Sequence, residues 1–199
     1  MNGVGPARVG ILGGTFDPPH IGHLVVADQV LDQLGLDEVR LVVSNVPWQK
    51  VGGRELTAPE RRLQLVEAAV TGCPGVEASS IELELGGPSY TAVTLETLAR
   101  REPEAEWLVI VGSDAAAGLD TWHRADELRV NHQFVVVNRP GAGPGPPPGW
   151  RCRPVEIPEL EVSSTELRRL IRRGRSVRHL TPEPVMQLLT EWGLYGRDL

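Results

Sequence analysis

Two histidines three residues apart follow a glycine-rich turn near the start of the chain. The segment reads Gly13-Gly-Thr-Phe-Asp-Pro-Pro-His-Ile-Gly-His23 and follows a short apolar run. Glycines let a backbone approach a polyphosphate closely, and amides at a helix start bind anionic oxygens. His20 and His23 share one helical face, where imidazoles can stabilise charge developing on a phosphoryl group, and Gly22 leaves room for a base or ribose. A metal site is the poorer interpretation, because two histidines alone make a weak ligand set.

A second polar motif, Val162-Ser-Ser-Thr-Glu-Leu-Arg168, opens an amphipathic segment near the other end of the chain. Ser163 and the glutamate three residues later have the spacing of a capping box. Such a cap would present Ser164, Thr165 and Arg168 at a helix start, ready to bind phosphate. We therefore expect two separated helix N-termini to converge on one triphosphate.

The elements that must position these motifs alternate between strand and helix. Strands are expected at 8–13, 39–43, 107–111, 134–137 and 155–157, helices at 21–34, 59–70, 89–101, 122–130, 163–173 and 184–192, and one or two short strands within 76–85. This order predicts an α/β fold with a Rossmann-like, doubly wound parallel sheet and C-terminal helices. Ligands bind such sheets at the carboxyl ends of the strands, so we expect the site in the turns after Leu12, Val43, Val111 and Ile157.

Size and composition are those of an ordinary globular protein. The 199 residues are expected to form a single domain, 1–199, with a Pro/Gly-rich surface loop at 141–149. A net charge of -6 argues against a nucleic-acid partner. Without an apparent signal peptide or an apolar run of about 20 residues, and with only Cys73 and Cys152 as thiols, we expect a cytoplasmic protein with no membrane partner. Assembly into a homo-oligomer is left open.

The two motifs together resemble those of the HxGH nucleotidyltransferase superfamily, with Val162 in place of the isoleucine of its ISSTxxR motif. The resemblance implies that His20 and His23 contact the ATP phosphates and stabilise a pentacovalent α-phosphorus. It implies a phosphate site that includes Arg168. The implied ATP-binding residues are Gly13, Gly14, Thr15, Phe16, Gly22, Gly112, Asp114, Ser163, Ser164 and Thr165. Mg²⁺ is expected to enter with the ATP, bound mainly by phosphate and water rather than by a dedicated protein site.

Three further segments resemble bacterial nicotinate-nucleotide adenylyltransferases. Pro88-Ser-Tyr-Thr-Ala92 implies that the amides of Tyr90, Thr91 and Ala92 hold a nicotinate carboxylate at a helix start. Asp120-Thr-Trp122 implies that Trp122 stacks on the pyridine ring, with His123 where the family often has another aromatic residue. Asn138-Arg-Pro-Gly141 implies a phosphate-binding or structural role for Arg139.

A fourth segment, Asn45-Val-Pro-Trp-Gln-Lys50, both matches and departs from this family. Asn45 and Pro47 fit its substrate loop, but Trp48 and Gln49 replace a proline and a histidine. Lys50, the only lysine in the chain, keeps the basic position and is assigned to catalysis, where its compact charge can follow a phosphate.

The implied activity is transfer of the adenylyl group of ATP to nicotinate mononucleotide, which forms nicotinate adenine dinucleotide and pyrophosphate on the way to NAD. Nicotinamide mononucleotide and phosphopantetheine are alternative acceptors. A non-catalytic nucleotide-binding module is the alternative from another class, since a phosphate cradle need not react.

Overall fold

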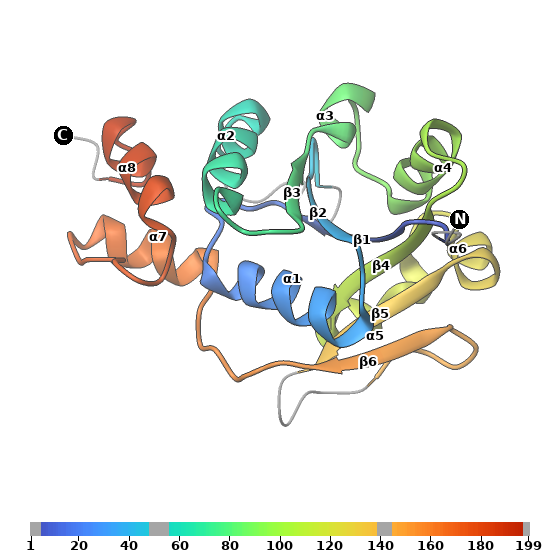
Figure 1. The fold of residues 1–199 in the computed structure, drawn as a ribbon. Coiled ribbons are helices and arrows are strands. Elements are labelled where there is room, and N and C mark those ends of the chain that lie inside the picture. The colour runs from blue at the N-terminus through green and yellow to red at the C-terminus, as the bar shows by residue number, and fades with distance from the viewer. Residues whose placement is uncertain (1–4, 48–55, 139–144, 197–199) are drawn as a thin grey trace.

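The computed structural model describes residues 5–47, 56–138 and 145–196 of the chain (Figure 1). Its sheet has six parallel strands in the order β3-β2-β1-β4-β5-β6. In chain order the elements are β1 Arg8–Gly14, α1 Ile21–Leu34, β2 Glu38–Val43, α2 Pro59–Val70, β3 Val76–Ser79, α3 Ile81–Leu85, α4 Thr91–Arg101, β4 Glu106–Gly112, α5 Ser113–Ala117, the 3-10 helix η2 Leu119–Thr121, α6 Ala125–Asn131, β5 Gln133–Asn138, β6 Cys152–Glu156, α7 Ser164–Arg172 and α8 Glu183–Glu191.

Both faces of the sheet are covered, because successive strand residues point to opposite sides. Val109 and Val111 of β4 belong to an apolar cluster with side chains of α3, α4, α5 and α6. Leu108 and Ile110, which alternate with them, belong to a second cluster with side chains of α1 and α2. The expected Rossmann-like, doubly wound α/β fold is confirmed.

The strand order reverses beside β1. The chain builds β2 and β3 on one side of β1, then crosses to place β4 on the other side. Neighbouring connections therefore leave β1 and β4 in opposite directions, which opens a crevice at their carboxyl ends. Gly14 ends β1 and Gly112 ends β4, so both glycines lie at this switch point.

Most expected elements lie within three residues of the observed ones. The segment 76–85, expected to hold one or two short strands, holds one strand followed by a helix that was not expected. Only Val76–Ser79 is a strand, and Ile81–Leu85 is a short helix. Apolar residues at 81, 83 and 85 suit a strand equally well, but pairing with β2 stops at Ser79 because the chain must leave the sheet edge to reach β4. Gly86, at φ 66°, ends this helix.

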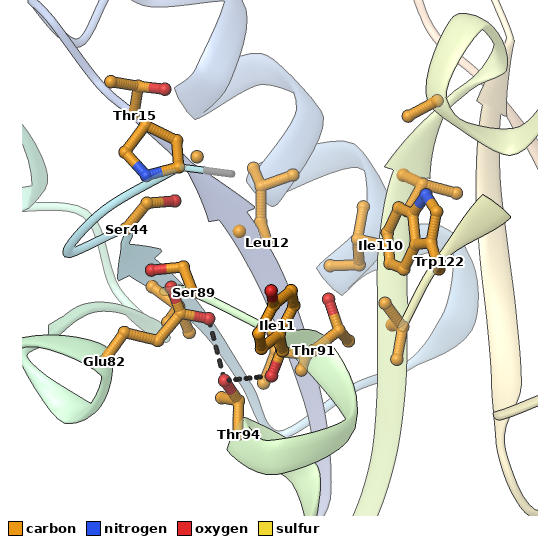
Figure 2. Close-up of a pocket in the computed structure, with 18 of the residues that line it drawn as sticks. Ile11, Leu12, Thr15, Ser44, Glu82, Ser89, Thr91, Thr94, Ile110 and Trp122 are labelled. Atoms are coloured by element: carbon orange, nitrogen blue, oxygen red, sulfur yellow. Dashed lines mark hydrogen bonds between the residues drawn. The ribbon is translucent and has the colours of Figure 1, made fainter. Parts of the chain in front are cut away.

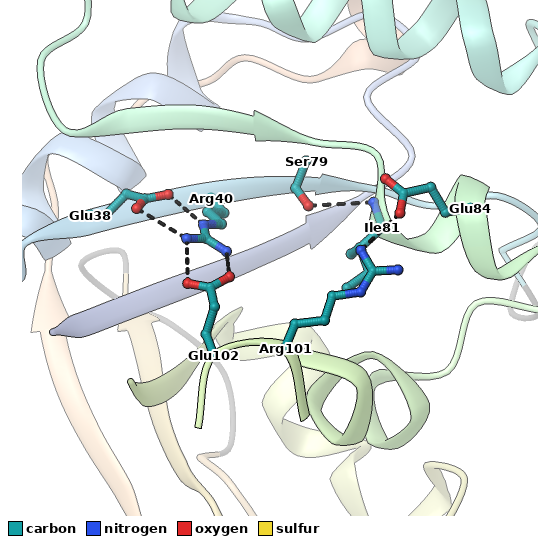
Figure 3. A network of polar contacts seen from close by, with 7 residues as sticks. All are labelled: Glu38, Arg40, Ser79, Ile81, Glu84, Arg101 and Glu102. Atoms are coloured by element: carbon teal, nitrogen blue, oxygen red, sulfur yellow. Dashed lines mark hydrogen bonds and ion pairs between the residues drawn. The ribbon is translucent and has the colours of Figure 1, made fainter. Parts of the chain in front are cut away.

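Two ion pairs hold the C-terminal end of the helix α4. At its end, Glu102 receives two hydrogen bonds from Arg40 of β2, of 2.6 and 3.0 Å (Figure 3). Arg101 pairs with Glu84 of α3 at 2.8 Å (Figure 3). Exposed pairs of this kind each contribute at most about 1 kcal/mol, so we treat them as fixing orientation more than stability.

The closing helices pack at the far side of α2. Leu65 and Ala69 of α2 form an apolar cluster with Val185 and Leu189 of α8. Among the described residues, no helix is both long and apolar enough to span a membrane. Of the Pro/Gly-rich segment 141–149, the described part, 145–149, has no regular secondary structure.

Candidate active site

The loop between β1 and α1 is shaped by a buried phenylalanine. Phe16 adopts φ 49° and is only 2% exposed, with its ring in the core beneath the loop. A Cβ at Gly14 would lie 2.8 Å from that ring, so glycine is required there, whereas a Cβ at Gly13 would meet open space. The side chain of Phe16 therefore packs under the loop and supports it. Its expected contact with ATP stays a prediction, and only its backbone is placed to make it.

The two histidines form one unit at the start of α1. His20 is the N-cap residue, and its backbone N–H donates to Nδ1 of His23 at 3.1 Å. The imidazole rings stack with centroids 3.7 Å apart and planes 25° apart. Because Nδ1 of His23 accepts a hydrogen bond, the proton of its neutral ring is on Nε2, which is therefore a donor.

The second motif docks directly on the loop that carries these histidines. Three successive carbonyls of the loop accept hydrogen bonds from the C-terminal part of the chain. They are Asp17 O from Arg168 Nη1 at 2.7 Å, Pro18 O from Ser164 Oγ at 2.7 Å and Pro19 O from Thr181 Oγ1 at 2.8 Å. The N-termini of α1 and α7 therefore lie side by side, as Figure 1 shows. That both bind one triphosphate stays a prediction.

Glycine at position 22 permits this docking. A Cβ on Gly22 would lie 2.9 Å from Val162 Cγ1 and 3.0 Å from His20 Nδ1. A side chain at this position would thus collide with the second motif and with the first histidine, so glycine permits close packing of the site. The expected contact of Gly22 with a base or ribose stays a prediction.

We expect Gly22→Ala to lower the free energy of unfolding by about 1–3 kcal/mol, because a β-branched neighbour has little freedom to yield to the new methyl group. Turnover should fall as well, since His20 must move. Chemical denaturation measures the first effect. Gly13→Ala is the matched control, and equal stability losses in the two variants would contradict this packing role.

Only one of the two hydrogen bonds of the expected capping box forms at the start of α7. Ser163 Oγ accepts a hydrogen bond from Glu166 N at 3.2 Å, but the Glu166 carboxylate pairs with Arg169 instead of returning to the cap. Ser163 and Thr165 are exposed, while Arg168 is 7% exposed and its Nη2 donates to Thr165 Oγ1 at 3.0 Å. Arg168 thus stabilises the loop between β1 and α1 through its hydrogen bond to the Asp17 carbonyl.

A cavity of about 300 Å³ opens at the switch point next to this loop (Figure 2). Expected site residues from four separate segments line it, namely Gly13, Gly14, Thr15, Tyr90, Thr91, Gly112, Trp122 and His123. The turns after β1, β2 and β4 all contribute to it, as expected. His20 and His23 do not line this cavity, because they lie further along the first loop. The second motif, which docks on that loop, does not line it either.

Aromatic residues form one side of the cavity. Trp122 is held edge-on by Phe134, with ring centroids 6.2 Å apart. His123 stacks on Tyr90, the N-cap residue of α4, with centroids 4.3 Å apart. The exposed His123 therefore covers the start of α4, where the amides of Thr91 and Ala92 begin the helix.

A residue without an assigned role in the sequence analysis, Arg62, holds two of these loops together. Its side chain is 1% exposed and donates to three carbonyls: Thr15 O at 2.9 Å, Asn45 O at 3.0 Å and Thr57 O at 2.8 Å. Asn45 also donates from its backbone N–H to Ser89 Oγ at 2.8 Å. Asn45 thereby connects the loop after β2 to the segment before α4.

The remaining expected residues are less defined by the structure. Asp114 is exposed in the first turn of α5, after cavity-lining Gly112. Lys50 and Arg139, together with Trp48 and Gln49, lie outside the described residues.

Near the end of the chain, Tyr195 donates its hydroxyl to the Asp17 carboxylate, and burial together with this carboxylate raises the pKa of the tyrosine.

Comparison with known proteins places this geometry in a family. The cytidylyltransferase-like family model matches residues 11–170. A curated protein of Exiguobacterium sibiricum, named "Probable nicotinate-nucleotide adenylyltransferase", is 45% identical over 95% of this chain and 99% of its own length. The chain belongs to the nicotinate-nucleotide adenylyltransferase family. A relative in that family from Saccharopolyspora erythraea is 41% identical over 96% of this chain and 91% of its own.

A solved structure agrees on the fold. The Plasmodium falciparum nicotinic acid mononucleotide adenylyltransferase complexed with NaAD aligns over 95% of this chain and 97% of its own, with a TM-score of 0.78 and 18% identity. Together with the relatives, this likeness indicates that members of the nicotinate-nucleotide adenylyltransferase family keep this six-stranded fold at low identity.

Proposed function

We propose that this protein transfers the adenylyl group of ATP to nicotinate mononucleotide and releases pyrophosphate. The observation that carries the proposal is the docking of α7 on the loop before α1. It brings two positive helix ends and the stacked imidazoles to one place, beside a cavity of suitable size for a nucleotide base. The names of the curated relatives favour nicotinate mononucleotide as the acceptor.

The reaction needs no covalent enzyme intermediate. A phosphate oxygen of the acceptor attacks the α-phosphorus of ATP in line, a P–O bond forms there, and the bond to the leaving pyrophosphate breaks. Positioning and charge neutralisation supply most of the acceleration in such transfers. We assign the donation from Nε2 of His23, with His20 beside it, to the α-phosphate, and the N-terminus of α7 to the pyrophosphate end.

Mg²⁺ would neutralise charge on the β- and γ-phosphates when it is bound with ATP. The described residues offer no group of three or more carboxylate, histidine or cysteine side chains for a metal ion. An ion that keeps most of its waters suits this donor set, with exposed Asp114 as the candidate for a water-mediated contact. We also assign phosphate contacts to Lys50 and Arg139, and we place the reaction in the cytoplasm, where ATP is abundant.

A comparison of three candidate acceptors tests the proposed function. The purified protein is supplied with ATP and Mg²⁺ and with nicotinate mononucleotide, nicotinamide mononucleotide or phosphopantetheine, and pyrophosphate is measured. We expect the highest kcat/KM with nicotinate mononucleotide. Fastest release with phosphopantetheine would reassign the acceptor, and ATP binding without release for any acceptor would favour a binding module.

We expect Trp122→Ala to raise KM for the pyridine nucleotide about tenfold and KM for ATP by less than about threefold, because stacking on a ring contributes roughly 0.5–1.5 kcal/mol beyond burial. Steady-state kinetics with each substrate varied in turn measure both. Trp122→Phe, which keeps an aromatic face against Phe134, is the control. Equal increases for both substrates would contradict the stacking role.

A further inference from the structure

A buried carboxyl group lies in the wall of the active-site cavity. Glu82 of α3 is 8% exposed, and it is the only carboxyl-bearing residue among the described residues that line the cavity. Figure 2 shows its side chain reaching toward the start of α4, next to Ser89 and Thr94. A charged group in this place would act on any ligand that binds at the α4 N-terminus.

The hydrogen bonds around this side chain compensate only partly for a charge on the carboxyl. Thr94 Oγ1 lies 2.8 Å from Glu82 Oε1 and 3.2 Å from the carbonyl of Tyr90, which can only accept (Figure 2). Because the hydroxyl has one proton, Thr94 shares its donation between these two oxygens and stabilises an ionised carboxyl only weakly.

Burial acts in the same direction. Glu82 Oε2 is buried and has no hydrogen-bond partner among the described residues. Burial raises the pKa of Glu82, and the hydroxyls of Ser89 and Thr94 offset only part of this increase.

We propose that Glu82 in the cavity wall controls the preference for an acceptor whose pyridine ring carries an anionic group, because its carboxyl leaves that preference intact while neutral and lowers it when ionised. The inference rests on the proposed function. The substrate carboxylate would bind the amides at the start of α4, on the same side of the cavity as Glu82. A neutral carboxyl tolerates or donates to that anion, whereas an ionised one repels it at short range in a site that excludes water.

The expected pH dependence follows from the sign of this interaction. Below its raised pKa, Glu82 is neutral and the anionic acceptor binds well; as pH rises through that pKa, Glu82 ionises and the anion is repelled. The amide group of nicotinamide mononucleotide is uncharged and is not repelled. Besides Glu82, the described titratable groups lining the cavity are Tyr90 and His123, and Glu84 on the same helix is exposed and paired with Arg101.

The test compares KM for nicotinate mononucleotide with the inhibition constant of nicotinamide mononucleotide over the whole pH range in which the protein stays folded and active. The two ligands share the ribose phosphate, so its titration cancels in the ratio. We expect the wild-type preference for the anion to fall at least tenfold over this range. In Glu82→Gln, which keeps shape but cannot ionise, the preference should stay at the low-pH wild-type value throughout.

His123→Phe is the matched control, because it keeps the stack on Tyr90 and removes a second titrating group; its preference should fall with pH as in the wild type. A pH-independent preference in the wild type, or an unchanged decline in Glu82→Gln, would overturn the role of Glu82. Absence of pyrophosphate release with nicotinate mononucleotide in the wild type would instead refute the proposed function, so the two failures are distinguishable.

Discussion

Replacement of either histidine at the start of α1 by alanine is expected to lower kcat at least a hundredfold. A group that stabilises charge developing in the transition state typically contributes about 3 kcal/mol or more. Because the His20 and His23 rings stack and the His20 backbone binds Nδ1 of His23, each ring depends on the other for its position. Pyrophosphate release at saturating substrates measures the effect.

The same coupling predicts that the double variant is little worse than either single variant, since residues that act as a unit are strongly non-additive. His132→Ala, at the end of α6 and therefore at the amino ends of the strands, is the control and should retain wild-type turnover. Thermal unfolding checks that the variants fold. Rates within tenfold of wild type in both single variants would refute the assigned role.

The second large effect concerns stability. In Arg62→Met, the carbonyls of Thr15, Asn45 and Thr57 lose their donor; the bond to Thr15 is buried and the other two are partly buried. An orphaned acceptor away from water costs about 1–3 kcal/mol, so we expect a total loss of about 3 kcal/mol in unfolding free energy. For a chain of this length that corresponds to a midpoint lower by about 6–12 °C.

The neighbouring residue provides the control. Arg61 lies with its guanidinium carbon 5.4 Å from the centre of the Trp192 ring, a contact worth about 0.5–1 kcal/mol at an exposed site. Arg61→Met should therefore shift the midpoint by only a few degrees. If the two methionine variants unfold at the same temperature, Arg62 does not hold the loops together as described.

The positions of Arg62 and Glu82 explain what sequence reasoning found and what it missed. The phosphate-site motifs were readable because residue type and local spacing carry their chemistry. Arg62 also left a signal, since it falls on the same helical face as Leu65, Val66 and Ala69, where a charged residue must be satisfied by hydrogen bonds. Two of its acceptors, however, are the carbonyls of Thr15 and Asn45, which lie 47 and 17 residues earlier in the chain, and no local pattern specifies them.

Glu82 left no comparable signal. Alternating apolar residues around it suggested a strand, in which a glutamate would face solvent, and only the departure of the chain from the sheet edge turns it into the cavity. Gly22 is a second case: the sequence indicated that a small residue is needed there, but not that the neighbour packed against it is Val162, 140 residues later. Long-range packing of this kind is decided by the fold.

The most direct measurement is a crystal structure of the protein with nicotinate mononucleotide, Mg²⁺ and an ATP analogue whose α–β bridge is a methylene group. We predict that the triphosphate contacts the stacked pair of His20 and His23 on one side and the N-terminus of α7 on the other. The pyridine ring should lie against Trp122. A triphosphate bound elsewhere, away from the contact between Ser164 and Pro18, would contradict the account.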